Sequence, residues 1–148
     1  MLTDRNIAFF IDVDGLRIKT ENYQMAIDQL QSMGTILHGK LYGCGERKHK
    51  AICKEAEIKG YKMERAKRIK RRGRKEFDNR IFVDVVDTVC TTPAVDAVCI
   101  ASPSCDMVYL YSYLRAKGIK IIALDNVDEA GKAFIDEFLD IGVELEIP

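Results

Sequence analysis

The segment NIAFFID, residues 6–12, contains an uninterrupted apolar run at residues 7–11, which the carboxylate of Asp12 follows directly. A strand that is apolar at successive positions is buried on both faces, which is typical of a parallel sheet covered by helices. Similar apolar runs occur at residues 97–101 and 119–124, with helical spacing between them. The segment therefore predicts a buried first strand and places Asp12 at its carboxyl end.

Strand-like and helix-like segments alternate along the rest of the chain. Strands are expected at residues 6–12, 35–42, 61–66, 97–101 and 119–124 and around Val143. Helices are expected at residues 23–33, 48–59, 77–90, 109–117 and 129–139. This order predicts an α/β three-layer sandwich with a mainly parallel central sheet. Since no repeat or linker interrupts the pattern, we expect a single domain over residues 1–148.

Composition limits the classes to which the chain can belong. Of its 148 residues, 47% are hydrophobic and 31% are charged, as in globular domains. No apolar run approaches the roughly 20 residues that cross a bilayer, and no signal-peptide pattern opens the chain. The five cysteines form no CxxC pair, which argues against a disulfide framework. We therefore expect a cytoplasmic protein with no membrane partner.

The net charge of zero hides a strongly basic stretch. Residues 59–75 carry ten basic side chains and one acidic side chain, whereas residues 76–148 carry five and fourteen. Such density is expected of a surface that contacts the phosphate backbone of nucleic acid, although a solvated loop is the alternative. The candidate nucleic-acid-binding residues are Lys67, Arg68, Lys70, Arg71, Arg72, Arg74 and Lys75.

Acidic and hydroxyl side chains follow the expected strands. Because ligands of parallel sheets bind at the carboxyl ends of strands, we expect these side chains to share one crevice. Carboxylates that converge without obvious counter-ions repel one another, and a hard cation, Mg²⁺ or Mn²⁺, relieves that repulsion. The candidate residues are Asp12, Asp78, Asp84 and Asp106, with Asp14, Ser102 and Ser104 as possible supporting groups.

Each candidate also has a structural alternative. Asp12 could be a turn or capping residue, Asp78 could cap the helix that follows it, and Asp84 could be a solvated or ion-paired residue. His49 has no ligand-like spacing and is expected to be structural or exposed. Cys105, at a helix start, could have a lowered pKa but has no histidine partner in the pattern.

Three motifs, in order, resemble those of the NYN domain family, whose members are relatives of the PIN-domain ribonucleases. FIDVDGL (residues 10–16) is similar to the opening strand motif, and KEFDNRIFVD (residues 75–84) matches the spacing of the second motif. IASPSCDM (residues 100–107) falls at the third motif, and LRAKGIKI (residues 114–121) continues in the family's manner. The resemblance covers nearly the whole chain and implies a PIN-like, Rossmann-like fold.

The resemblance also implies metal-dependent hydrolysis of RNA phosphodiesters. By it, Asp12 is the central ligand of Mg²⁺ or Mn²⁺, Asp78 is a second ligand, and Asp106 is a ligand or orients bound water. Asp84 is a further candidate ligand, and the basic stretch would hold single-stranded or structured RNA. The sequence departs from the family at four positions, where Gly15 replaces Asn, Pro103 replaces Gly, Ser104 replaces Asp and Met107 replaces Phe.

These departures keep alternatives open. The missing carboxylate at Ser104 favours a catalytically impaired module that binds RNA or a protein without cutting, and a homodimer is possible. The sequence DVDG, residues 12–15, also resembles the nucleophile motif of haloacid-dehalogenase-like phosphatases. In that case Asp12 would attack phosphate and Asp14 would act as general acid.

Overall fold

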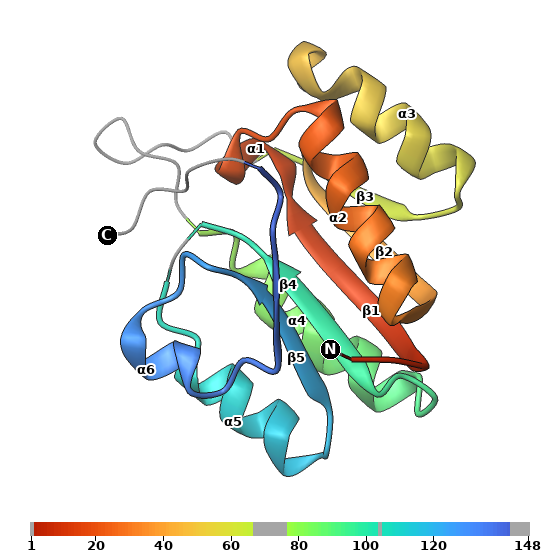
Figure 1. Ribbon diagram of the computed structural model, residues 1–148. Helices are drawn as coiled ribbons and strands as arrows, with labels where there is room; N and C mark the ends of the chain where they lie inside the picture. Colours follow the sequence, from red (N-terminus) through yellow and green to blue (C-terminus); the bar gives the residue numbers. More distant parts are fainter. Residues whose placement is uncertain (1, 67–76, 104, 143–148) are drawn as a thin grey trace.

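A six-stranded parallel sheet forms the centre of the molecule. Figure 1 shows strands β1 to β5 of this sheet between the helices. The computed structural model describes residues 2–66, 77–103 and 105–142. The strand order is β3-β2-β1-β4-β5-β6, and every neighbouring pair is parallel. The strands are β1 (Arg5–Asp12), β2 (Gly34–Cys44), β3 (Lys62–Arg65), β4 (Ala97–Ala101), β5 (Lys120–Leu124) and β6 (Glu137–Leu139). The predicted α/β class is confirmed.

Helices cover both faces of this sheet and complete the three layers. Alternate residues of β1 point to opposite faces, so Phe9 packs in one core with α2 and α3, and Phe10 packs in the other with α4 and α5. The helical segments are α1 (Val13–Leu16), α2 (Thr20–Met33), the 3₁₀ turn η1 (Arg47–His49), α3 (Lys50–Ile58), α4 (Arg80–Thr91), α5 (Val108–Ala116) and α6 (Glu129–Lys132).

The strand order determines where a ligand would bind. β1 pairs with β2 on one side and with β4 on the other, so the order of strands reverses beside β1. In open α/β sheets, ligands bind outside the carboxyl ends of the strands at such a reversal. Asp12, the last residue of β1, lies at this point.

The carboxyl-terminal part differs from the prediction. The helix expected at residues 129–139 is wrong, because α6 ends at Lys132 and residues 137–139 form β6 along the edge of β5. Asp136 directs this pairing, since its backbone N–H donates to Ile121 O (2.8 Å) and its Oδ2 accepts from Ile121 N (2.8 Å). The strand expected around Val143 lies outside the described residues.

Some of the predicted site residues lie outside the described part of the chain, and one lies before the helix on which it was expected. The basic stretch from Lys67 to Lys75 and the candidate Ser104 lie outside the described residues. The helix expected from residue 77 begins at Arg80, so Asp78 lies in the turn before α4. Among the described helices, none combines the length and apolarity that crossing a membrane would need.

Buried tyrosines predict the response of the fold to alkaline pH. Burial raises the pKa values of Tyr23, Tyr42 and Tyr111 above their ordinary value of 10.0. In the unfolded chain these hydroxyls lose protons near pH 10, whereas the native state keeps them, so the unfolded state binds fewer protons there. We therefore expect the free energy of unfolding to fall as pH rises above about 10. Urea unfolding at about pH 8 and about pH 11 measures the decline, which should be shallower in Tyr42→Phe; equal stability at both pH values would contradict the prediction.

Candidate functional site

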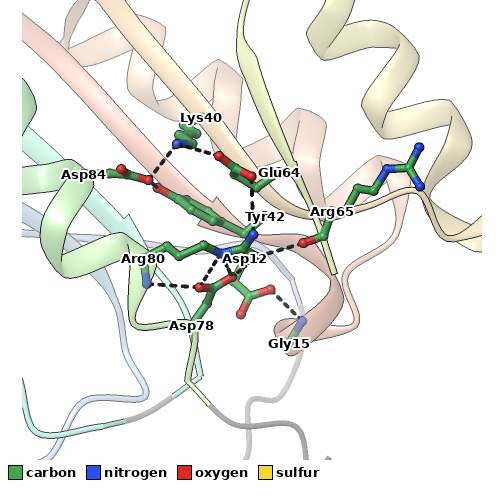
Figure 2. A network of polar contacts seen from close by, with 9 residues as sticks. All are labelled: Asp12, Gly15, Lys40, Tyr42, Glu64, Arg65, Asp78, Arg80 and Asp84. Carbon is green, nitrogen blue, oxygen red and sulfur yellow. Dashed lines mark hydrogen bonds and ion pairs between the residues drawn. The ribbon is translucent and has the colours of Figure 1, made fainter. Parts of the chain in front are cut away.

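Asp12 is held at the end of β1 by the first turn of α1. Asp12 is 5% exposed. Its Oδ1 accepts a hydrogen bond from Gly15 N at 2.8 Å (Figure 2). A Cβ on Gly15 would lie 2.4 Å from Asp12 Oδ2 and 2.7 Å from Pro103 Cγ. The departure from the family's Asn at this position therefore has a local reason, because the turn after β4 and the Asp12 carboxylate leave no room for a side chain.

Asp78 lies in the turn before α4 and is 4% exposed. Its Oδ1 accepts from the backbone N–H of Arg80 (3.1 Å), which forms an Asx-type turn before the N-cap residue Asn79 of α4. The Arg80 side chain also donates to it, from Nε to Oδ1 (2.9 Å) and from Nη2 to Oδ2 (2.5 Å). The result is a bidentate ion pair between residues two positions apart.

The same guanidinium reaches two other elements. Arg80 Nη1 donates to Glu64 Oε2 (3.3 Å), and Nη2 donates to the carbonyl oxygen of Arg65 (2.8 Å), both on β3. Hydrogen bonds to Asp78 raise the pKa of Arg80. Arg80 therefore joins the start of α4 to the end of β3 (Figure 2).

Asp12 and Asp78 come together around Tyr42. Asp12 pairs in register with Tyr42 of β2, and such partners point to the same face of a parallel sheet. Arg80 lies over the Tyr42 ring, 5.8 Å from its centroid, and the charge of Asp78 contributes to the raised pKa of Tyr42. Figure 2 shows the two carboxylates in the same region below that ring. The structure thus brings together two of the predicted site residues.

Asp84 lies at the other end of this polar network. Its Oδ2 accepts from Tyr42 Oη (2.5 Å) and forms an ion pair with Lys40 Nζ (2.7 Å), which also binds Glu64 Oε1 (3.2 Å). Burial alone would lower the pKa of Lys40, but the hydrogen bonds to Asp84 and Glu64 raise it overall. Asp84 is therefore an ion-paired residue, the alternative considered for it.

The described part of the third motif holds Asp106 and Ser102 in local contacts. Asp106 is exposed, and its Oδ1 accepts from Val108 N (3.1 Å) at the start of α5. Ser102 is buried, and its Oγ donates to Pro103 O (3.2 Å). Burial raises the pKa of the Cys105 thiol to about 11, so the lowered pKa considered for this helix start is wrong.

Asp14 pairs with a histidine that sequence spacing did not identify. His49 Nε2 lies 3.0 Å from Asp14 Oδ1, and the more exposed Lys48 Nζ lies 3.5 Å from the same oxygen. His49 is 3% exposed, so it is a buried partner of an acidic residue. The sequence could have indicated this pair only through position. Asp14 follows the end of β1 and His49 follows the end of β2, and the carboxyl ends of neighbouring parallel strands lie at the same edge of the sheet.

The carboxylates have more counter-ions than the sequence suggested. The expectation that they converge without counter-ions is wrong, because Arg80 binds Asp78, Lys40 binds Asp84, and Lys48 lies near Asp14. Arg80 and Glu64 were not among the predicted site residues. An arginine two positions after Asp78 in the second motif was the available signal for one of them.

The described side chains offer few groups that could bind a metal ion. Within residues 2–66, 77–103 and 105–142, no three His, Cys, Asp or Glu side chains are grouped as metal ligands would be. Asp12 and Asp78 are buried carboxylates, and such hard oxygen donors suit Mg²⁺ or Mn²⁺. Their chemistry fits such a cation, but the bidentate contact from Arg80 already neutralises one of them.

A parallel sheet in this order, with buried carboxylates where the strand order reverses, defines a Rossmann-like α/β domain with an acidic site. The NYN domain model matches residues 6–142, and the chain belongs to the NYN family. The resemblance seen in the motifs is thereby confirmed. The NYN family is related to the PIN-like nucleases, and nucleases of this kind generally act on RNA and depend on divalent metal ions.

A crystal structure of a protein of unknown function from Vibrio parahaemolyticus is similar, with a TM-score of 0.63, 16% sequence identity and 92% of each chain covered. At that identity the likeness shows the fold alone. No curated protein matches the chain significantly. The phosphatase alternative has lost its basis, since the family is NYN and the Asp14 that it needs as general acid pairs with His49.

Proposed function

We propose that this NYN domain is a metal-dependent endoribonuclease whose site is built on Asp12 and Asp78. The observation that supports the proposal is the burial of both carboxylates at the reversal of strand order, where a ligand of such a sheet binds. Burying a carboxylate is unfavourable unless it is paired or coordinates a cation. Gly15 N–H holds Asp12 and Arg80 holds Asp78, so two ordered, buried carboxylates lie where such a sheet binds its ligand.

In this proposal each residue has a separate task. Asp12 and Asp78 would hold Mg²⁺ or Mn²⁺, with Asp106 as a third group that contacts the cation or its water. When bound, the cation activates a water molecule and stabilises negative charge on the phosphate. Gly15 N–H fixes one oxygen of Asp12 and so orients the carboxylate. Asp84, which is paired with Lys40, would support Tyr42 and not bind the cation directly.

The charge of the basic stretch in the sequence also supports RNA as the substrate. The stretch leads directly into the second motif, which carries Asp78, and contains Lys67, Arg68, Lys70, Arg71, Arg72, Arg74 and Lys75. These cations would neutralise phosphates of the bound strand, which predicts binding that weakens as salt rises.

A binding module that does not cut RNA is the second candidate. Two observations favour it: the family's third-motif Asp is Ser104 here, and Arg80 already neutralises Asp78. Both candidates share the same RNA surface and differ only in the chemical step. Affinity for RNA therefore does not distinguish them, whereas cleavage does.

Cleavage of labelled single-stranded and structured RNA in Mn²⁺, Mg²⁺ and EDTA tests the proposal. We expect cleavage with Mn²⁺ or Mg²⁺, none with EDTA, and faster cleavage by Ser104→Asp, which restores the family's carboxylate. Gly15→Asn is a poorer restoration, because a Cβ there would lie 2.4 Å from Asp12 Oδ2. Salt-dependent RNA binding without cleavage in either metal would establish the binding module instead.

A further inference from the structure

The Arg80 side chain uses all three guanidinium nitrogens on fixed partners. Nε and Nη2 bind Asp78, Nη1 binds Glu64, and Nη2 also binds the carbonyl oxygen of Arg65. A planar guanidinium that binds a carboxylate through two nitrogens gives one of the stronger ion-pair geometries in proteins. Arg80 is thus an ordered part of the site.

The carboxylate of the Asp78–Arg80 ion pair is buried, whereas the guanidinium is partly exposed. The Asp78 side chain is 5% exposed, whereas the Arg80 side chain is 36% exposed. A buried carboxylate without a compensating cation is strongly disfavoured, so Asp78 requires a positive partner. Because an arginine stays protonated in proteins, Arg80 can give up Asp78 only by moving, and its exposed side leaves it free to do so.

A divalent cation on Asp78 would compete with this partner. The cation and the guanidinium carry like charges and would draw on the same two oxygens, so each opposes the binding of the other. Glu64 and the face of the Tyr42 ring provide Arg80 with other partners on β3 and β2. The apparent affinity for a cation is then reduced by the fraction of time that Arg80 holds Asp78.

We propose that Arg80 is an internal counter-ion of Asp78 that sets the affinity of the site for a divalent cation. The role rests on the proposed function, since it requires Asp78 to be a cation ligand. In this role Asp78 binds either the Arg80 guanidinium or the divalent cation. Binding of the divalent cation therefore releases the guanidinium beside Asp78. A released guanidinium suits a phosphate oxygen of the bound strand.

Mn²⁺ titration by calorimetry in the absence of RNA tests this role. Arg80→Met removes the competing charge, and we expect it to bind Mn²⁺ at least about tenfold more tightly than the wild type. Arg80→Lys, which keeps the charge but loses the planar contact, should fall between them. Arg115→Met is the matched control, because Arg115 contacts Ala133 O and the Phe134 ring and no carboxylate in the described part of the chain.

The melting temperature provides a second readout if Arg80→Met is much less stable than the wild type. Loss of Arg80 leaves Asp78 buried without its guanidinium, so we expect a lower Tm without metal and a larger rise in Tm with Mn²⁺ than in the wild type. Adding Asp78→Asn to Arg80→Met should abolish the gain in Mn²⁺ affinity.

The outcomes separate this role from the proposed function. Equal or weaker Mn²⁺ affinity in Arg80→Met and Arg80→Lys would overturn the role of Arg80, even if the wild type cleaves RNA. A gain that persists in the double variant would overturn it too, because Asp78 would not be the ligand involved. Tighter Mn²⁺ binding without any RNA cleavage would support the role of Arg80 and contradict the ribonuclease.

Discussion

Asp12→Asn is expected to lower the rate of RNA cleavage by roughly a hundredfold or more, the effect typical of removing one group that stabilises a transition state electrostatically. The fold should survive, because Asn caps helix starts about as well as Asp and its amide oxygen can still accept from Gly15 N. The substitution therefore removes the charge and leaves the local geometry. Initial rates of RNA cleavage in Mn²⁺ measure the loss.

RNA binding gives the control for this variant. Removing one negative charge near the phosphates should leave affinity unchanged or slightly increased, which fluorescence anisotropy at several salt concentrations would detect. Asp125→Asn serves as the matched substitution, since the Asp125 side chain is 75% exposed and pairs with Lys132 on α6. Cleavage by Asp12→Asn at the wild-type rate would show that the proposed site is wrong.

Gly43→Ala is expected to destabilise the fold more than Gly60→Ala, although both glycines have a positive φ. Gly43 has φ +89°, and a Cβ there would lie 2.2 Å from Asp14 Cβ and 2.8 Å from Asp14 N. The left-handed conformation costs a residue with a Cβ about 1–2 kcal/mol, and overpacking adds about 1–3 kcal/mol. We therefore expect the free energy of unfolding to fall by about 2–5 kcal/mol.

Gly60→Ala separates the two contributions. Gly60 also has a positive φ, +80°, but a Cβ there meets nothing within 4 Å. Its substitution should cost only the conformational part, about 1–2 kcal/mol. Urea unfolding of both variants gives the packing contribution by difference, and equal losses would contradict the contact between Gly43 and Asp14. RNA cleavage by Gly43→Ala should also fall, because α1 carries Asp14 and follows Asp12 directly.

Much of the fold follows from local patterns. The run at residues 6–12 predicted a doubly buried strand, and Ile7, Phe9 and Phe10 are each 0% exposed. The alternation of strands and helices then predicted parallel pairing, because a helix between two strands returns the chain in the same direction. Such signals are reliable since they depend on neighbouring residues of the same segment.

The prediction at residues 129–139 shows where local patterns are insufficient. Ala130, Phe134 and Phe138 recur at helical spacing, yet residues 137–139 form β6. The edge of β5 offers unpaired backbone groups, and pairing with them outweighs the local preference. Strand formation at an edge depends on a partner, which periodicity within the segment does not reveal.

The sequence by itself determined the α/β class, the family motifs and the position of Asp12 and Asp78 near strand and helix ends. The tertiary structure alone decided which charges meet: Arg80 with Asp78 and Glu64, Lys40 with Asp84, and His49 with Asp14. The physical reason is distance along the chain. Burial patterns repeat within one element, whereas most of these ion pairs join elements that only the folded sheet brings together, and their strength depends on burial and on ångström separations.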